Sequence, residues 1–337
     1  MRELTSKWLL RVGSFVLAGV LLWLALRNVD LAEVWAILSV AHYVWMLPLA
    51  LITIASHWIR AVRWKIFLEA LPQHQSHTKP ISTLNTFLSI MIGNMANYAG
   101  PRIGEVIRIG NVSRREKLPF SAVFGTVFAE RVFDLATFAI ALISVPIIFS
   151  QQIAELWRLL IQPIHSLLLK ISVVWWFSGL VLMVGLFVGA VLFVIKVAKR
   201  PDSKLFRTLT SFKDGILSLV KSEQRVRIGL LTIGMWACYG VMAYIPFLLL
   251  GQADIYQIGP IEAWGIMLIG VLGVILPSPG GLGTFHFVTI QSLGLLFAMP
   301  NTDAAAYALV SHAGQMLFYI LVGTIGILYL GNVDPKK

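Results

Sequence analysis

The sequence predicts an all-α, polytopic membrane protein with about six full spans and two re-entrant helical hairpins in an inverted repeat. Of its 337 residues, 58% are hydrophobic and 13% are charged, whereas soluble domains carry about 25% charged residues. Apolar segments of about 20 residues, the length that crosses roughly 30 Å of hydrocarbon, recur along the chain. Two further apolar segments are interrupted by glycine and proline.

The uninterrupted apolar segments are predicted to span the membrane. The first follows a basic N-terminus, as in a signal sequence, but no Ala-x-Ala-like cleavage site follows it and more spans come later. It is therefore expected to be a retained helix. The predicted spans are 8–27, 41–59, 118–149, 170–196, 228–250 and 304–330.

The two interrupted segments, around 81–115 and 261–299, are predicted to enter the membrane and return to the same side. Basic residues dominate both flanks of the first segment, whereas the flanks of the second carry acidic residues and no Lys or Arg. Short cytoplasmic loops are rich in Lys and Arg. A full crossing by the first segment would place the basic linker between the fourth and fifth spans outside, against this tendency.

This topology divides the chain into two halves of opposite orientation, residues 1–150 and 151–337. The second half contains an apolar and basic stretch at 200–225 that is predicted to lie in the membrane interface. A faint sequence echo supports the repeat, because "GPRIGE" can be laid on "PGGLGT" of the second interruption. Paired interrupted segments in inverted halves are typical of transporters, where they mark the substrate site.

The first candidate site lies where Gly100-Pro101 breaks the apolar run, and its residues are Asn97, Arg102, Glu105 and Arg108. A helix that starts at this break would direct free N–H groups toward the hairpin tip. With two arginines, which bind phosphate through paired N–H donors, the tip would suit an anion. Alternatively, these charges belong to an ordinary cytoplasmic loop.

The second candidate site is Glu130, Arg131 and Asp134, near the middle of a predicted span. A charge at this depth costs about 2.5 to 3.5 kcal/mol on insertion scales, so the three residues need partners or a wet cavity. Glu130 and Asp134 share a helix face, and Arg131 is expected to reach Asp134. The alternative to a substrate path is a self-neutralising salt bridge that locks helices together.

The third candidate site is the second interruption and its surroundings. Several helix breakers within seven residues favour a hairpin tip over a simple kink. Thr284 is predicted to cap the helix that follows, and the two nearby histidines are either functional or ordinary hydrogen-bonded core residues. The residues of this site are Pro277, Gly280, Gly281, Gly283, Thr284, His286, His312 and Gln315.

Three motifs resemble the lysylphosphatidylglycerol synthase transmembrane region, or flippase-like domain: "GPRIGEVIR", "ERVFD" and "PSPGGLG". The resemblance spans nearly the whole chain. It implies a polytopic domain that moves lipids with modified headgroups, such as aminoacylated phosphatidylglycerol or polyprenyl-linked sugars, between leaflets.

The chain departs from the family pattern at two positions. His286 stands where an acidic residue is common, and His312 stands near the place of a basic residue in the last span. These histidines leave the substrate class open and could confer pH dependence. The aminoacylating members also carry a soluble synthase domain after the spans; because this chain ends at Lys337, it is expected to make no aminoacyl ester.

We therefore expect a lipid flippase of the bacterial cytoplasmic membrane, with both termini cytoplasmic, that binds an anionic lipid headgroup and needs no metal or cofactor. The alternatives are a membrane-embedded transferase or hydrolase acting on lipid and a scaffold for a separate lipid-modifying enzyme. No nucleophile elbow, zinc motif or nucleotide loop favours an enzyme. The net charge of +11 lies in short loops, which argues against nucleic acid as a partner.

Overall fold

The computed structural model describes residues 2–74, 79–100, 103–152, 207–208, 210–214, 217, 224–275 and 278–332. These residues form α-helices and short 3-10 turns, with no β-strand among them. The all-α fold class is thus confirmed. The predicted span 170–196 and most of the stretch 200–225 lie outside the described residues.

The N-terminal part contains one correction to the predicted spans. The third helix continues to Glu69 instead of ending near residue 59. No helix breaker follows Arg60, and Trp64, Phe67 and Leu68 bury the continuing face, so the helix extends beyond its most apolar stretch. The elements here are α1 (Arg2–Leu26), α2 (Leu31–Ser39), the 3-10 turn η1 (Tyr43–Trp45) and α3 (Met46–Glu69).

The first interrupted segment forms a tight helical hairpin. Ser82 caps its first arm by accepting a hydrogen bond from the N–H of Asn85. The arms touch at Gly93 and Gly104, where a Cβ on Gly104 would lie 1.8 Å from the Gly93 carbonyl oxygen. The arms are α4 (Thr83–Ala96) and α5 (Ile103–Arg115), and α6 (Phe120–Leu142) and α7 (Ser144–Ile148) follow.

The second interrupted segment forms a similar hairpin. Its arms touch where a Cβ on Gly273 would lie 2.7 Å from the carbonyl oxygen of Thr284. The elements of this part are α12 (Arg225–Leu249), α13 (Gln252–Ile255), α14 (Pro260–Ile275), the 3-10 turn η3 (Pro279–Gly281), α15 (Thr284–Phe297) and α16 (Asn301–Asn332).

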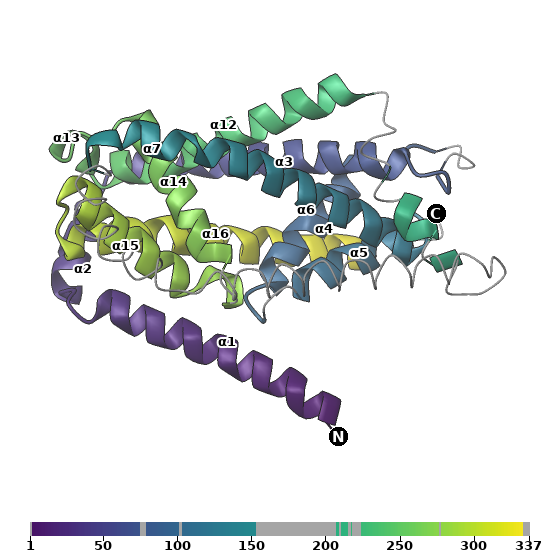
Figure 1. The fold of residues 1–337 in the computed structure, drawn as a ribbon, viewed down its shortest axis with the longest axis horizontal. Coiled ribbons are helices and arrows are strands. Elements are labelled where there is room, and N and C mark those ends of the chain that lie inside the picture. The colour runs from purple at the N-terminus through teal and green to yellow at the C-terminus, as the bar shows by residue number, and fades with distance from the viewer. Residues whose placement is uncertain are drawn as a thin grey trace, which may run out of the picture.

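The long helices run roughly along one axis of an elongated bundle (Figure 1). Helix α3 packs along α12, and α16 packs against one arm of each hairpin, α4 and α15. Close approach of α4 requires Gly323 on α16, where a Cβ would meet the Met95 side chain at 2.9 Å. One apolar core surrounds each hairpin, so α16 joins the two cores.

Several described helices are long and apolar enough to cross a membrane. Five pass by length and composition, or six if α1 and α2, bent by 79°, form one broken span. A multi-pass membrane protein is thus confirmed, whereas the inverted repeat remains a prediction. The five helical segments are Tyr43–Glu69, Phe120–Ile148, Arg225–Leu249, Pro279–Phe297 and Asn301–Gly331.

Candidate functional site

A network of charged side chains joins α3, α5 and α6 beside the first hairpin. Glu130 lies at its centre and is fully buried. Its Oε1 accepts hydrogen bonds from Arg60 Nε at 2.8 Å and Arg63 Nη2 at 3.5 Å. Its Oε2 accepts one from Arg108 Nη2 at 3.1 Å. Three guanidinium groups around one carboxylate supply the counter-charges without which a buried acid would be too costly.

The network reaches the protein surface in two steps. Arg108 Nε donates to Glu105 Oε2 at 2.7 Å, and the other Glu105 oxygen accepts from Arg131. The exposed fraction rises from 0% for the Glu130 side chain to 23% for Glu105 and 48% for Arg131. Ion pairs therefore connect the surface to the buried centre in the order Arg131, Glu105, Arg108 and Glu130, and we call this series the ladder.

A second branch of the network ends at Asp134. Arg63 Nη2 donates to Asp134 Oδ1 at 2.6 Å, and Arg63 Nη1 donates to Thr232 Oγ1 on α12 at 3.1 Å. The guanidinium of Arg108 also lies 4.8 Å from the ring centre of Trp64, a favourable cation–π distance. These contacts fix four helices, α3, α5, α6 and α12, around the network.

The network carries more positive than negative charge. Four arginines, Arg60, Arg63, Arg108 and Arg131, face three acids, Glu105, Glu130 and Asp134. The buried atoms Arg60 Nη2, Arg63 Nε and Arg108 Nη1 have no hydrogen-bond acceptor among the described residues. A buried donor without an acceptor costs about 1 to 3 kcal/mol. Oxygens of an anion such as phosphate could satisfy such donors.

Sequence reasoning missed Arg60 and Arg63. Both were expected in a cytoplasmic loop, but they lie in α3 and are almost completely buried. The predicted span ends at residue 59, and every basic residue between that span and the first hairpin is assigned to a loop. A usable signal was present, because the three-residue spacing of these arginines places them on one helix face, as the four-residue spacing does for Glu130 and Asp134.

The predicted pairing of Arg131 with Asp134 is also wrong. Arg131 bonds Glu105 on α5, and Asp134 bonds Arg63 on α3. Ion pairs between helices thus replace the pairing expected within α6. The expectation that Glu130 and Asp134 share a face agrees with the contacts, because both accept hydrogen bonds from Arg63.

The tips of the two hairpins touch each other. Gly280, in the second tip, has φ +59°, and a Cβ there would lie 2.3 Å from the ring of Tyr98 in the first tip. His312 Nε2 on α16 lies 2.9 Å from the Gly280 carbonyl oxygen. Gly281 and Gly283 also have positive φ, 79° and 77°. This backbone geometry, which favours glycine, allows the tip to fit between Tyr98 and α16.

Both predicted histidines lie at this contact. The ring centres of His286 and His312 are 4.9 Å apart, and Phe285 stacks on His312 at 5.6 Å. His286 Nδ1 is buried and has no hydrogen-bond partner among the described residues. Of the residues predicted for the third candidate site, Gly280, His286 and His312 therefore meet at this contact.

Thr284 does not cap α15 as predicted. Gly283 occupies the N-cap position, and Thr284 is the first helical residue. Its hydroxyl lies 2.8 Å from the Ser278 hydroxyl and donates to the Gly281 carbonyl oxygen at 3.1 Å. The side chain thus bonds back into the hairpin tip and does not cap the free N–H groups of α15.

Other predicted site residues lie apart from these contacts. The side-chain oxygen of Asn97 accepts a hydrogen bond from the Gly104 N–H at 2.9 Å, so it joins the hairpin arms. Gln315, one turn after His312, is partly buried. Arg102 and Pro277 lie outside the described residues.

A polar contact between α3 and α16 was not expected from the sequence. His57 Nε2 lies 3.0 Å from the Tyr319 hydroxyl. His57 is one turn before Arg60 on α3, and Tyr319 is two turns after His312 on α16. The pair thus joins α3 to α16, near Arg60 of the charge network on one helix.

Comparison with known families gives one match over most of the chain. The model of the lysylphosphatidylglycerol synthase TM region matches residues 11–323. The family resemblance expected from the three motifs is thus confirmed.

Curated relatives match at lower identity. Glycosyltransferase AglD of Haloferax volcanii is 26% identical, and the match covers 96% of this chain but 54% of that protein, so the chain spans about half its length. A UPF0104 membrane protein of Methanocaldococcus jannaschii is 23% identical, with 83% of each chain covered. Another, of Methanothermobacter thermautotrophicus, is 24% identical, with 80% of this chain and 79% of the relative covered. No solved structure gives a significant match.

Proposed function

Because this chain belongs to the family of lysylphosphatidylglycerol synthase transmembrane regions, we propose that it moves a lipid with a phosphate-containing headgroup between membrane leaflets. The headgroup could be aminoacylated or polyprenyl-linked. The observation that carries the proposal is the surplus of buried guanidinium donors beside the first hairpin.

The network has the chemistry of a phosphate receptor. Guanidinium groups bind phosphate through two parallel N–H donors, and Arg60, Arg63 and Arg108 each keep one buried donor without an acceptor among the described residues. One arginine in excess over the acids favours an anion electrostatically. The carboxylate of Glu130 holds the three side chains in place when no headgroup is present.

The ladder to the surface supplies a route for the headgroup. Arg131 is half exposed, and Glu105 joins it to Arg108. A headgroup phosphate that displaces Glu105 from Arg131 would exchange one ion pair for another. The headgroup thus loses its hydration in steps, and the free energy of desolvating its charge is divided among these steps.

The hairpins suit a barrier inside the membrane. Helices α4, α5, α14 and α15 have 13 to 16 residues, or about 20 to 24 Å at 1.5 Å per residue, less than the roughly 30 Å of hydrocarbon. Tips with non-helical backbone at membrane depth need protein or water around them. We propose that the contact of Tyr98 with Gly280 closes the path and separates when the headgroup passes.

A leaflet assay tests the proposal. The purified protein is reconstituted into vesicles that contain phosphatidylglycerol with a dithionite-sensitive label on its headgroup. The fraction of the label that external dithionite reduces is followed with time. Arg131→Gln should slow translocation at least about tenfold, since it removes a charge-assisted donor to the headgroup. Glu105→Gln should also slow it, because Arg108 and Arg131 lose the carboxylate that holds them in position. The matched control is Arg225→Gln, an exposed arginine at the start of α12. Wild-type rates in both ladder variants would end the assignment.

A lipid-modifying transferase is the second candidate, because one relative is named a glycosyltransferase and His286 keeps a buried nitrogen without a partner among the described residues. The ion pairs of Glu130 and Asp134 argue against either acid as a free general base. Mass spectrometry of the vesicle lipids separates the two functions, because a transferase changes covalent structure and a flippase changes only the leaflet.

The third candidate is a scaffold for a separate lipid-modifying enzyme. It predicts that the isolated wild-type protein neither moves nor modifies lipid in these two assays. Translocation by the isolated protein would exclude this role as its sole function.

A further inference from the structure

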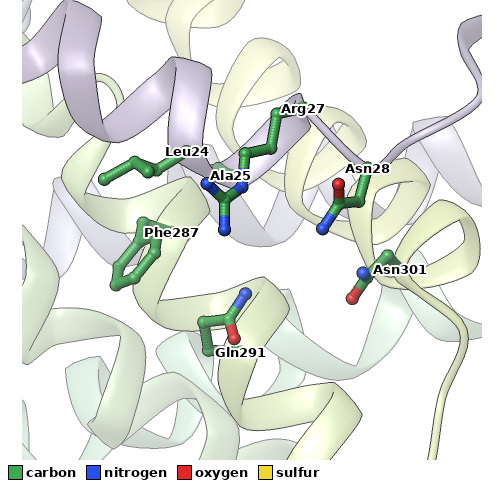
Figure 2. Close-up of a pocket in the computed structure, with 7 residues that line it drawn as sticks. All are labelled: Leu24, Ala25, Arg27, Asn28, Phe287, Gln291 and Asn301. Atoms are coloured by element: carbon green, nitrogen blue, oxygen red, sulfur yellow. The ribbon is translucent and has the colours of Figure 1, made fainter.

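We infer that a pocket near the C-terminal end of α1, between α1, α15 and α16, binds an oxyanion such as the phosphate of a lipid headgroup. The pocket has a volume of about 290 Å³, close to the lower limit for small-molecule sites. Its polar side chains come from Arg27, Asn28, Gln291 and Asn301. In Figure 2 the guanidinium of Arg27 and the amide of Gln291 point toward each other across the pocket.

Arg27 lies in a part of the described chain that is poor in basic residues. Residues 27–45, 250–262 and 298–303, which are all described, contain no other Lys or Arg. They contain five acids: Asp30, Glu33, Asp254, Glu262 and Asp303. Arg27 is exposed and forms no ion pair with a described residue, so its guanidinium is accessible to a ligand.

Three of these acids are engaged elsewhere. Asp30 caps α2 by accepting from the Ala32 N–H at 2.8 Å. Glu262 accepts from the Gly259 N–H at 2.9 Å, and Asp303 accepts from the Tyr256 hydroxyl. No carboxylate of the described residues lines the pocket. The pocket therefore offers a guanidinium and amide N–H groups without an acidic competitor, a combination that suits an oxyanion.

The surroundings of the pocket place it near the membrane interface. Trp23, whose ring centre lies 5.7 Å from the Arg27 guanidinium, is 62% exposed. Trp35 and Tyr43 at the same end are also exposed. Trp and Tyr gather where lipid headgroups meet hydrocarbon. The apolar walls formed by Leu24 and Phe287 would then lie against the first part of the acyl chains.

The site concerns binding and does not depend on translocation. It lies near the end of α1 and on α15 and α16, whereas the charge network lies on α3, α5 and α6. Loss of binding at Arg27 and loss of transport at Glu105 are therefore separate results. If the protein moves lipid, this pocket would be a second headgroup site, apart from the network.

Calorimetric titration of the purified full chain in detergent tests the inference in two arms, one with dihexanoyl phosphatidylglycerol and one with sodium phosphate. Arg27→Gln should raise the dissociation constant about tenfold or more, because it removes a charge-assisted donor. Arg27→Lys should have a smaller effect because it keeps the charge. Gln291→Ala tests the pocket independently, and Arg225→Gln is the matched control.

The two arms identify the occupant. A weakening by Arg27→Gln and Gln291→Ala in the phosphatidylglycerol arm supports a lipid headgroup. The same weakening in the sodium phosphate arm alone supports the oxyanion site with a free anion as its occupant. Equal affinities of the wild type and both pocket variants in both arms would overturn the inference.

Discussion

Nε of Arg60 donates a 2.8 Å hydrogen bond to Oε1 of Glu130, 70 positions further along the chain. Both side chains are buried, at 9% and 0% exposure. Each charge taken alone is out of place inside a membrane helix, and together they are an ion pair that fixes α3 to α6. Interhelical pairing thus explains how this apolar chain retains charges at depth.

Glu130→Gln should destabilise the protein strongly. The substitution leaves Arg60, Arg63 and Arg108 buried without their shared carboxylate, and removing one partner of a buried ion pair costs about 3 to 5 kcal/mol. The measurement is thermal unfolding in detergent, followed by tryptophan fluorescence. Arg131→Gln, at the exposed end of the network, should cost less than about 1 kcal/mol. Equal melting temperatures for the two variants would contradict the central place of Glu130.

Gly104→Ala should force apart the arms of the first hairpin. The new methyl group would lie 1.8 Å from the Gly93 carbonyl oxygen, and relief would also disturb the bond from the Gly104 N–H to Asn97. We expect a lower melting temperature and reduced yield of monodisperse protein. Gly110→Ala is the control on the same helix, because a Cβ there meets nothing within 4 Å. It should be neutral or stabilise by up to about 1 kcal/mol.

Gly280→Ala should disturb the contact between the hairpin tips. Its φ of +59° disfavours any side chain by about 1 to 2 kcal/mol, and the Tyr98 ring fills the space that the methyl group would need. Unfolding experiments should show partial rescue by Tyr98→Ala, which removes the clash and leaves the dihedral cost. A Gly280→Ala effect that is the same with and without Tyr98→Ala would refute the contact. Gly294→Ala, whose Cβ would meet only the Met299 carbonyl oxygen at 3.6 Å, should be close to neutral.

Cysteine labelling in whole cells tests the re-entrant topology. In a background that lacks the single native cysteine, Cys238, Lys79→Cys and Arg114→Cys flank the first hairpin at exposed positions. Both should react with a membrane-impermeant maleimide only after the membrane is permeabilised, because basic flanks are retained on the cytoplasmic side. Asp254→Cys should react in intact cells. Opposite labelling of the first two positions would show a full crossing.

Local patterns predicted the hairpins and part of the site. Glycine and proline interruptions gave the places where α4 and α5, and α14 and α15, separate, since clustered glycines permit non-helical backbone and proline removes a helix hydrogen bond. The depth of Glu130 in an apolar segment indicated a residue in need of partners. Local patterns could not identify Arg60 and Arg63 as those partners. After an apolar segment, the sequence does not distinguish a basic residue in a continuing helix from one in a loop.

The sequence by itself determined the all-α fold, the membrane location, the two hairpins and the family, because each follows from hydropathy, helix breakers and short motifs that act locally. Only the tertiary structure decided which charges pair and that Tyr98 lies over Gly280. It also decided that Arg27 lines a pocket with Gln291. These contacts join residues far apart in the chain, and the packing of α3, α6, α12 and α16 sets which side chains come within hydrogen-bonding distance.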